Sequence, residues 1–503
     1  MNFADILAKH ASSRPDHPAI VDGSRVITYQ DLHRYVFTVA INLQTSGIKA
    51  GDVVAVTLVD SAEYLIAILA LARAGAVMVS IDGELPAPEK VEAISHARAK
   101  AIVIGTPEDS IADLPRLHIA KLFQSTLADF EKPSVDSGHP LTIVQSSGTT
   151  GTPKSFFWSH RAMEVQAIRH QRCFGWTEQD RYLAVVSMKF FWERELCFIL
   201  LYLGATIIVN DVAPPDQIVE KVRAERITIM ALTPAHLNDF LGLQTNESPI
   251  FPSVRTMVVG SAPLTNERRI RVRRQLTPNF YEQLGTNEAG LLVLGTPGDQ
   301  DARPDAIGRV VTGVEAKVTD ANGNVVPSGV VGLVGFRGEG FPSGYVENPE
   351  ATARSFRDGW FYPGDLAAID EHGYFHFKGR IDDIINFQGA KFYPIEVEKA
   401  LLAHPAVAEA TVIGWPDPTS GETPVAFVVT LHQVSADELR SFCCQRIASY
   451  KSPNRFVFVN RMPKTRTGKI LRRSLKEIYG ELLAKRSAAP ANTTDAVGSS
   501  AEI

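Results

Sequence analysis

The stretch 141-LTIVQSSGTTGTPKSFFW-158 places a loop rich in Ser, Thr and Gly between two apolar strand-like segments. Such a loop offers backbone N–H groups and hydroxyls to a phosphate, and Lys154 adds positive charge. The segment from Gly148 to Ser155 would match the P-loop pattern GxxxxGK[ST] if Pro153 were a glycine. Proline has no N–H to donate and biases the preceding residue toward extended geometry. We therefore interpret the stretch as a strand–loop–strand grip for a nucleotide, with a plain surface turn as the competing interpretation.

Strand and helix signals alternate on both sides of this loop. The elements expected before it are strands over Val53–Val59, Ala76–Ile81 and Ala101–Ile104, and helices over Ala62–Ala74, capped by Ser61, and Pro88–Ala99. Those expected after it are strands over Ala205–Val209, Ile227–Leu232 and Thr256–Val259, and a helix over Pro215–Glu225. Such alternation predicts parallel strands with helices on both faces, the α/β class with doubly wound sheets.

The pattern changes near residue 314, where hairpin signals replace alternating strands and helices. Val314–Val318 and Val325–Val326 flank an Asp-Ala-Asn-Gly turn, and Leu366–Ile369 and Tyr374–Phe377 flank Glu-His-Gly. These pairs predict an antiparallel sheet or small β-barrel attached to the α/β body. We expect a large N-terminal domain over residues 1–378, a small α+β domain over 379–485, and a disordered tail over 486–503.

Composition limits the class of protein further. The 503 residues are 45% hydrophobic and 21% charged, and their net charge of −5 disfavours a nucleic-acid binder, which is usually basic. Four cysteines without CxxC spacing are typical of a reducing compartment. The first ten residues lack the basic and apolar regions of a secretory signal. The longest apolar run, Tyr64–Ala72, is shorter than the ~20 residues needed to cross a bilayer. We therefore expect a cytoplasmic protein with no transmembrane segment.

Five further motifs accompany the loop, in a fixed order along the chain. They are Gly260-Ser-Ala-Pro-Leu264, Leu284-Gly-Thr-Asn-Glu288, Gly359-Trp-Phe-Tyr-Pro-Gly-Asp-Leu366, Gly379-Arg-Ile-Asp-Asp383 and Pro463-Lys-Thr-Arg-Thr-Gly-Lys-Ile470. With these motifs the chain resembles the acyl-adenylate-forming (ANL) superfamily, which includes acyl-CoA synthetases, adenylation domains and luciferases. The resemblance extends from about Ile27 to Arg473.

The resemblance implies a role for each motif in binding ATP. Lys469 is expected to reach the carboxylate and α-phosphate, Glu288 to hold Mg²⁺, and Asp365 and Arg380 to bind the ribose. The full set of implied nucleotide-binding residues is Ser146, Ser147, Gly148, Thr149, Thr150, Gly151, Lys154, Ser261, Ala262, Pro263, Glu282, Gln283, Leu284, Gly285, Thr286, Asn287, Asp365, Arg380 and Lys391. A preorganised cation at developing negative charge is worth ~10²–10³ in rate, so Lys469 and Glu288 are the expected catalytic residues.

The small domain is expected to alternate between two positions. By resemblance, Asp382 is the hinge, and rotation replaces Lys469 by the stretch Gln388, Gly389 and Ala390, which lines the tunnel for the thiol. Lys469 must withdraw before a thiol can enter, and this is the logic of a gating motion. An ordinary turn at a domain boundary is the competing interpretation of Asp382.

The chain departs from its relatives at several positions of these motifs. Leu284 replaces the usual aromatic residue against adenine, Asn287 replaces Thr, Ser155 replaces Gly, and Tyr362 stands where Thr is common. Leucine still offers an apolar face. These changes bear on affinity for the nucleotide more than on the chemistry.

The acyl pocket is expected around the stretch Ser187–Glu195, where many relatives carry Pro-x-x-His. Its aromatic residues Phe190, Phe191 and Trp192 favour a flat or medium-length apolar acid, with core packing as an equal alternative. No Asp is present to hold an amino group, although Glu193 could serve.

Two further features of the sequence, a cluster of arginines and His160, are interpreted as structural. Arg268, Arg269, Arg271, Arg273 and Arg274 could meet a phosphate of CoA or an acidic carrier protein, but a solvated helix face is the favoured interpretation. His160 is expected to pack near a helix N-terminus and to transfer no proton.

The sequence thus predicts a ligase that uses ATP, Mg²⁺ and CoA. It activates a carboxylic acid as acyl-AMP with release of pyrophosphate and then forms a CoA thioester. One alternative transfers the acyl group to the phosphopantetheine of a carrier protein, and another is a non-catalytic nucleotide-binding relative. The identity of the acid and the formation of a homodimer are left open.

Overall fold

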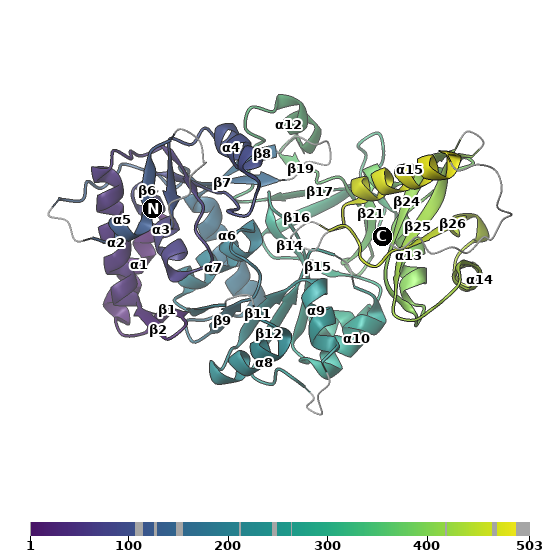
Figure 1. Cartoon of the computed structure of the whole chain (residues 1–503), viewed down its shortest axis with the longest axis horizontal. Helices are drawn as coiled ribbons and strands as arrows, with labels where there is room; N and C mark the ends of the chain where they lie inside the picture. Colours follow the sequence, from purple (N-terminus) through teal and green to yellow (C-terminus); the bar gives the residue numbers. More distant parts are fainter. Residues whose placement is uncertain are drawn as a thin grey trace.

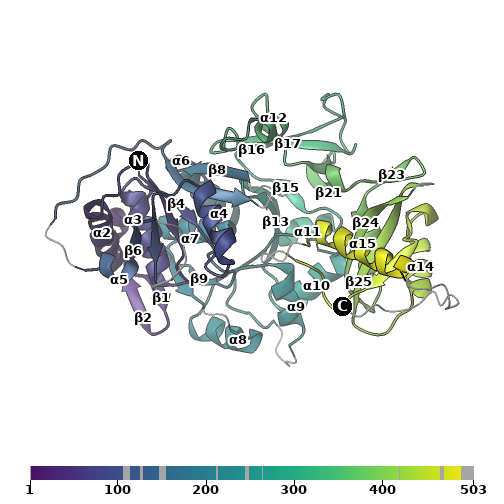
Figure 2. The same ribbon diagram turned by 45° about the horizontal axis from the view of Figure 1, so that its top comes forward.

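The computed structural model describes residues 2–105, 114–124, 128–146, 154–210, 213–243, 249–262, 264–417, 420–464 and 470–488. Residues up to Arg380 build two large sheets with their helices, and the residues that follow build a smaller sheet beside them (Figure 1). The view in Figure 2 shows the same separation.

The first sheet has six strands and holds the predicted nucleotide grip at one edge. Its order is β6 (Arg116–His118), β5 (Ala101–Ile104), β3 (Val53–Val56), β4 (Val77–Ser80), β7 (Pro140–Ser146) and β8 (Lys154–Ser159). All neighbours are parallel except β7 and β8, which pair antiparallel from Pro140–Ser159 to Ser146–Lys154. The strand–loop–strand prediction is therefore confirmed.

The second sheet is longer and changes character along its length. Its first part holds β2 (Arg25–Thr28), β1 (Pro18–Asp22), β10 (Thr206–Val209), β9 (Arg181–Ala184), β11 (Ile229–Leu232), β12 (Thr256–Val259) and β13 (Phe280–Thr286), parallel from β1 onward. Its second part is antiparallel and holds β14 (Gly290–Gly295), β15 (Gly308–Val310), β21 (Tyr374–Arg380), β20 (Asp365–Ile369), β17 (Gly332–Gly338), β19 (Trp360–Phe361) and β18 (Phe356–Arg357), with β16 (Val314–Thr319) beside β17.

Helices cover both large sheets. They are α1 (Ile6–Ser13), α2 (Tyr29–Thr45), α3 (Ala62–Arg73), α4 (Ala87–His96), α5 (Ile119–Leu122), α6 (His160–Phe174), α7 (Phe191–Leu203), α8 (Pro215–Ala224), α9 (Pro234–Leu241), α10 (Asn266–Gln275), α11 (Pro297–Ala302) and α12 (Pro349–Ser355), with a 3-10 turn η1 (Phe3–Asp5) before α1. Serine side chains cap α3 and α6 as predicted, because Ser61 Oγ accepts from the Tyr64 N–H at 3.2 Å and Ser159 Oγ from the Ala162 N–H at 3.1 Å.

The main core lies between the two sheets, with α2, α3, α6 and α7 contributing to it. Successive side chains of a strand point to opposite faces, so Val54 and Val56 of β3 enter this core while Ala55 packs in a second core with Ile94 of α4. A further core joins the outer face of the second sheet to α8, α9 and α10. The prediction of doubly wound α/β sheets is confirmed.

The predicted hairpin at residues 314–326 is confirmed only in part. Val325 bridges Thr319 and the Val326 N–H donates to the Val318 carbonyl at 3.0 Å, but the long partner of β16 is Gly332–Gly338. Val325 is 68% exposed, whereas Phe336 of β17 is fully buried, so burial favours the later strand. The other predicted hairpin is confirmed as β20 and β21.

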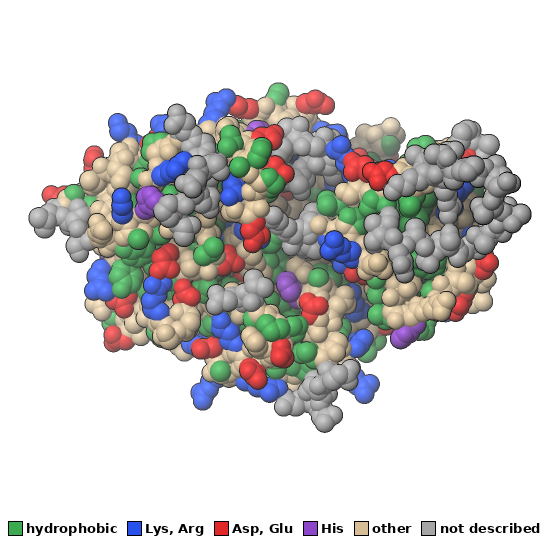
Figure 3. Space-filling model, in the orientation of Figure 1, with side chains coloured by type: hydrophobic (Ala, Val, Ile, Leu, Met, Phe, Trp, Pro, Cys, Tyr) green, Lys and Arg blue, Asp and Glu red, His purple; other side chains and the backbone are tan. Residues whose placement is uncertain are grey.

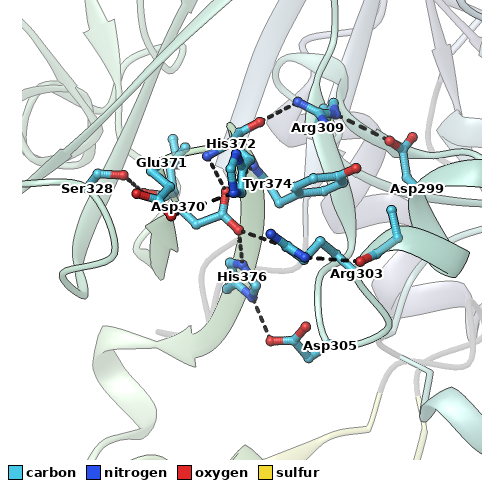
Figure 4. A network of polar contacts seen from close by, with 12 residues as sticks. Asp299, Arg303, Asp305, Arg309, Ser328, Asp370, Glu371, His372, Tyr374 and His376 are labelled. Atoms are coloured by element: carbon cyan, nitrogen blue, oxygen red, sulfur yellow. Dashed lines mark hydrogen bonds and ion pairs between the residues drawn. The ribbon is translucent and has the colours of Figure 1, made fainter.

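A polar network braces the hairpin of β20 and β21 on the side of α11 and β15 (Figure 4). His376 lies between Asp370 and Asp305, with nitrogen–oxygen distances of 3.1 Å to each. Arg309 contacts Asp299 at 3.3 Å and lies 3.9 Å from the centre of the Tyr374 ring. These contacts hold the strand that leads to Arg380.

The smaller sheet holds β23 (Ala390–Phe392), β22 (Ile385–Phe387), β25 (Gly421–Thr430), β24 (Val407–Asp417) and β26 (Arg455–Phe458). Its helices are α13 (Pro394–Leu402), α14 (Ala436–Cys444) and α15 (Arg472–Ala488), with 3-10 turns η2 (Ile381–Asp383) and η3 (Ser449–Lys451). One core lies against α13 and α14 and the other against α15, which crosses the sheet in Figure 2. α15 continues three residues past the expected domain end at 485, and residues 489–503 of the expected tail lie outside the described residues.

No helix in the described part of the chain is long and apolar enough to cross a membrane. On the face drawn in Figure 3, acidic and basic side chains are interspersed. All four cysteines are free thiols. His160 is buried at the start of α6, where its Nδ1 accepts the Phe3 N–H at 3.1 Å, so its predicted packing role is confirmed.

Candidate active site

A cavity of about 960 Å³ is lined by residues of both the large sheets and the small sheet. Its walls include residues of α6 and α7 in the large part and of β24 and the start of α15 in the small part, which lie on opposite sides of the molecule's centre in Figure 1. This volume is typical of a site for a small molecule. Most of the described residues that the motifs predict for nucleotide binding line it. They are Lys154, Ser261, Ala262, Glu282, Gln283, Leu284, Gly285, Thr286, Asn287, Glu288, Asp365 and Arg380.

Asp365 and Arg380 face each other across the hairpin of β20 and β21. They are a register pair, and Arg380 Nη1 lies 3.1 Å from Asp365 Oδ1. Arg380 Nη2 also donates to the Pro363 carbonyl at 2.9 Å. Gly364 between them has φ +90°, and a Cβ there would lie 3.0 Å from Arg380 Nη2. The glycine therefore allows the arginine to approach the backbone closely, and the charged pair is set before any ligand binds.

Glu288 and Lys154 meet through a residue that the sequence reasoning missed. The Tyr345 hydroxyl donates to Glu288 Oε1 at 3.0 Å, and Lys154 Nζ lies 5.1 Å from the centre of the Tyr345 ring. Burial is the main cause that lowers the pKa of Lys154, followed by the charge of Arg354. Tyr345 lies outside the recognised motifs, and no spacing in the sequence marks it.

The segment 282–288 forms a tight wall at the end of β13. A Cβ on Gly285 would lie 2.6 Å from the Gly290 carbonyl oxygen, so only glycine fits there. The Trp158 Nε1–H donates to the Asn287 carbonyl at 2.9 Å, which ties the wall to β8. Ser261 on the facing wall has φ +79°, a conformation that is costly for a residue with a side chain.

Glu282 is the first residue of this wall, and its carboxylate is bonded to protein groups. Its Oε2 lies 2.6 Å from Arg269 Nε and its Oε1 accepts the Leu264 N–H at 3.2 Å. Both side chains of the ion pair are at most 5% exposed, and burial raises the pKa of Glu282. Glu282 lines the cavity as predicted for this wall, its carboxylate oxygens hold Arg269 and Leu264, and its contact with the nucleotide stays a prediction.

The same ion pair corrects the interpretation of the arginine cluster on α10. Arg269 is buried, Arg268 donates to the Pro234 carbonyl at 2.5 Å, and Arg273 pairs with Asp301 at 2.5 Å. The helix is only partly a solvated face, because four of its arginines connect it to neighbouring elements, the fourth being Arg271, which donates to the Leu241 carbonyl at 2.8 Å.

Several predicted residues lie outside the cavity wall. Gln388 and Gly389 both have positive φ and form the two-residue turn between β22 and β23, with Ala390 and Lys391 next in β23. None of these four lines the cavity. Asp382 is exposed in η2, the segment between the large and the small sheets.

The small part reaches the cavity through other residues. Lys464, Ile470 and Arg472 line it, and Arg472 contacts Asp383 beside the expected hinge at 3.3 Å and Glu398 at 2.6 Å. Lys464 and Ile470 flank Lys469 and bridge each other. Residues Ser147, Gly148, Thr149, Thr150, Gly151, Pro263 and Lys469 lie outside the described residues, as does the side chain of Ser146.

The aromatic residues at the start of α7 line the cavity, as expected of an acyl pocket. Phe190 and Trp192 are partly exposed, and Phe191 also packs on Trp158 with ring centres 5.3 Å apart. Glu193 is fully buried, accepts the Tyr182 hydroxyl at 2.7 Å and does not line the cavity. The idea that Glu193 could hold an amino group is therefore wrong.

The described residues fit a magnesium ion that is held chiefly by a nucleotide. Glu288 offers a hard carboxylate to the cavity, while no group of three or more His, Cys, Asp or Glu side chains among the described residues could enclose a metal. Mg²⁺ binds through one or two carboxylates, substrate phosphates and water, so a single carboxylate suits it.

Comparison with known proteins shows the family. Residues 7–346 match the AMP-binding enzyme family and residues 396–469 match the AMP-binding enzyme C-terminal domain. The chain is 32% identical over 491 residues to a feruloyl-CoA synthase from Amycolatopsis sp., covering 94% of this chain and 98% of that protein.

Solved structures with the same fold carry the relevant ligands. The O-succinylbenzoate coenzyme A synthetase of Bacillus subtilis, in complex with ATP and magnesium ion, has a TM-score of 0.86 at 25% identity and covers 94% of this chain and 99% of that one. The anthranilate CoA ligase AuaEII, in complex with anthranoyl-AMP, has a TM-score of 0.87 at 26% identity and covers 96% and 98%. The chain belongs to the AMP-binding enzyme family, and the predicted membership of the acyl-adenylate-forming superfamily is confirmed.

Proposed function

We propose that this chain activates an aromatic carboxylic acid with ATP and transfers the acyl group to CoA. The reaction class is that of an AMP-forming acid–thiol ligase that uses ATP, Mg²⁺ and CoA, and this prediction is confirmed by the relatives. The aromatic acid is the finer part of the proposal. The observation that carries it is a single cavity that joins the nucleotide motifs to the aromatic residues of α7. The feruloyl-CoA synthase and the anthranilate CoA ligase, both named for aromatic acids, support it.

The charged residues at the nucleotide end would each bind one part of ATP or its magnesium ion. Asp365 would accept from the ribose hydroxyls while Arg380, already paired with it, donates from the other side. Lys154 would face the phosphates, and its lowered pKa reflects a cation that gains from an incoming anion. Glu288 would hold Mg²⁺, which neutralises charge on the phosphates when bound.

The second step would use a different set of residues. We infer that Lys469 neutralises the first reaction and that rotation about Asp382 brings Gln388, Gly389, Ala390 and Lys391 to the cavity for the thioester step. In support, the turn with these residues is exposed, while the chain on both sides of Lys469 lines the cavity. The division into domains at residues 378 and 379 and a cytoplasmic location stay predictions.

A panel of aromatic and aliphatic acids tests the substrate class. Pyrophosphate release with ATP and each acid reports adenylation, and mass spectrometry with free CoA reports the thioester. We expect aromatic acids to give the highest kcat/KM. Equal or better activity with aliphatic acids would contradict the proposal, and accumulation of acyl-AMP despite free CoA would favour a carrier-protein acceptor.

Two variants test the division of labour between the half-reactions. Lys469→Ala should lower adenylation by about 10²–10³-fold while leaving thioester formation from supplied acyl-AMP largely intact. Asp382→Pro should do the reverse, because proline fixes the backbone at the hinge. Equal losses in both half-reactions would contradict these assignments.

A further inference from the structure

The deep end of the cavity carries two polar side chains on one face of α7. Trp192 and Glu195 are three residues apart, and such residues lie next to each other on a helix surface. Both line the cavity, and Glu195 is only 4% exposed. The small-domain residues Lys464 and Arg472 line the same cavity. In Figures 1 and 2, α7, which carries Trp192 and Glu195, lies apart from α15, so we call its part of the cavity the deep end.

Each of them holds a buried polar atom with nothing to bond to. Among the described residues, Trp192 Nε1 and Glu195 Oε1 have no hydrogen-bond partner. A buried polar atom in this condition costs about 1–3 kcal/mol. Other unpartnered buried atoms exist among the described residues, but those of Trp192 and Glu195 belong to side chains that line the cavity and are neighbours on one helix face. One is an N–H donor and the other a carboxyl oxygen, so together they offer complementary contacts to one small group.

The surroundings of Glu195 keep its carboxyl neutral. Burial raises the pKa of Glu195 to about 8, and the positive charge of Arg169 opposes this only in part. Arg169 itself donates to the carbonyls of Ala289 and Glu339, at 3.5 and 3.2 Å. Glu195 Oε1 has no hydrogen-bond partner in the described part of the chain. At neutral pH the group is a carboxylic acid and not a carboxylate.

A neutral histidine lines the same cavity. His170 Nδ1 lies 2.9 Å from the Gln166 carbonyl, which can only accept, so Nδ1 carries the proton. Burial is the main cause that lowers the pKa of His170 to about 4. His170 thus adds a neutral hydrogen-bonding group, while the buried cation Arg194 of α7, which also lines the cavity, donates to the Met188 and Lys189 carbonyls at 2.8 and 2.7 Å.

We propose that Trp192 and Glu195 form a subsite that binds a hydroxyl group on the ring of the aromatic acid, remote from its reacting carboxylate. A hydroxyl donates one hydrogen bond and accepts others, so it can satisfy Glu195 Oε1 and Trp192 Nε1 together. An ammonium group cannot accept from the indole, and an apolar group leaves both atoms unpaired. The inference rests on the proposed function and names the substrate class within it.

Glu193 on the same helix provides a matched control. It is also a buried glutamate with one unpartnered carboxyl oxygen, Oε2, but its Oε1 accepts the Tyr182 hydroxyl at 2.7 Å and it does not line the cavity. Residues 193 and 195 point in different directions because two residues advance an α-helix by about 200°. A change at Glu193 should therefore affect stability without affecting the choice of acid.

The test compares hydroxylated acids with their deoxy counterparts. The pairs are 3- and 4-hydroxycinnamate against cinnamate, and the readout is the ratio of their kcat/KM values for pyrophosphate release. The wild-type chain should prefer a hydroxylated acid by about 10-fold or more, since a site that hydrogen-bonds a hydroxyl rejects analogues without it. Glu195→Leu should lower that ratio by about 10-fold and Trp192→Phe by about 3-fold, because each removes one partner of the hydroxyl. Glu195→Gln, which stays neutral and can still hydrogen-bond, should keep most of the preference, and Glu193→Gln all of it.

The outcomes separate the subsite from the proposed function. Activity on aromatic acids with a ratio near one, or a ratio unchanged in both Glu195→Leu and Trp192→Phe, would overturn the subsite alone. A preference for 4-aminocinnamate over 4-hydroxycinnamate that Glu195→Gln abolishes would overturn the hydroxyl and assign the subsite to a neutral aromatic amine. No pyrophosphate release with any aromatic acid would defeat the proposed function and the subsite together. If Glu195→Leu does not fold, Trp192→Phe alone decides.

Discussion

The two ends of the cavity differ in how their acidic side chains are bonded, although Gln283 Oε1 at the nucleotide end also lacks a partner among the described residues. At the nucleotide end, Asp365 pairs with Arg380 and Glu288 accepts from Tyr345. At the acyl end, Trp192 Nε1 and Glu195 Oε1 have no partner among the described residues. Groups that stabilise charge in the reaction are held in place in advance, which is where electrostatic catalysis gains most. Groups that select the acid form their hydrogen bonds only when the acid binds, so an acid without the right polar atom leaves them unpaired.

The two ends are also encoded differently. Asp365 and Arg380 belong to one hairpin and are directly paired across it, so a short stretch of sequence determines their geometry. The acyl end combines α6 with α7, and its polar atoms depend on how the two helices pack. If this contrast holds, changes at the nucleotide end should affect every acid alike and changes at the acyl end should not.

Loss of the ribose-binding carboxylate should have the largest effect. Asp365→Asn removes the charge that faces Arg380, and kcat/KM for ATP should fall by about 100-fold, as with the loss of one preorganised polar group. The fall should be the same with hydroxylated and deoxy acids. Pyrophosphate release measures it, with Asp370→Asn in the same hairpin as the control. A loss that depends on the acid would break the contrast between the two ends.

Loss of the buried ion pair between Arg269 and Glu282 of the 282–288 wall should have the largest effect on unfolding free energy. Arg269→Met leaves Glu282 charged and unpaired in a region where both side chains are at most 5% exposed, so unfolding free energy should fall by about 3–5 kcal/mol. Arg273→Met on the same helix should lower unfolding free energy much less, because its partner Asp301 is 67% exposed. Urea denaturation compares the two. Equal losses would mean that the wall does not depend on the pair.

Glu195 at the acyl end should make the unfolding free energy depend on pH. The pKa of Glu195 is raised by burial from 4.5 to about 8, so between these values the folded chain holds a proton that the unfolded chain has released. Unfolding free energy therefore falls as pH rises through this window. Glu195→Gln removes this titrating proton. The unfolding free energy of the variant should therefore fall less steeply with pH than that of the wild-type chain, by up to about 1.4 kcal/mol per pH unit. Urea titrations from pH 6.5 to 8.5 measure both slopes, and His170, with a pKa lowered to about 4, stays neutral throughout. Equal slopes would show that Glu195 is not held neutral.

Much of the fold follows from local sequence. Ser61 and Ser159 cap their helices as predicted because a side-chain oxygen next to a free N–H needs no tertiary context. The choice of Gly332–Gly338 over Val325–Val326 could not be predicted, because it depends on which strand buries Phe336. Pairing between distant strands is decided by the core and not by the turn.

Some residues of the candidate site could likewise be predicted from the sequence, and others could not. Motif spacing was sufficient to bring Asp365, Arg380 and Glu288 to one cavity. It could not assign Glu193 and Glu195, because both lie on an apolar helix and only packing shows which one reaches the cavity. Tyr345 was missed for a related reason, since its contact with Glu288 joins segments 57 residues apart.

The network beside the β20–β21 hairpin should have the smallest effect and no effect on the choice of acid. Burial alone would raise the pKa of Asp370, but hydrogen bonds from His376 and from the N–H groups of Tyr374 and His372 outweigh it and lower the value to about 2 (Figure 4). A carboxyl with a lowered pKa contributes stability that is complete above its ordinary value of 3.8 and is lost as pH falls toward 2. Asp370→Asn should thus lower Tm by about 1–2 °C at pH 7, because partly exposed pairs are weak, and the difference from wild type should shrink at pH 3. Asp370 does not line the cavity, so relative kcat/KM values across the acid panel should stay constant. A changed preference among acids would show that this hairpin transmits strain to the acyl end, and the two ends would then not be independent.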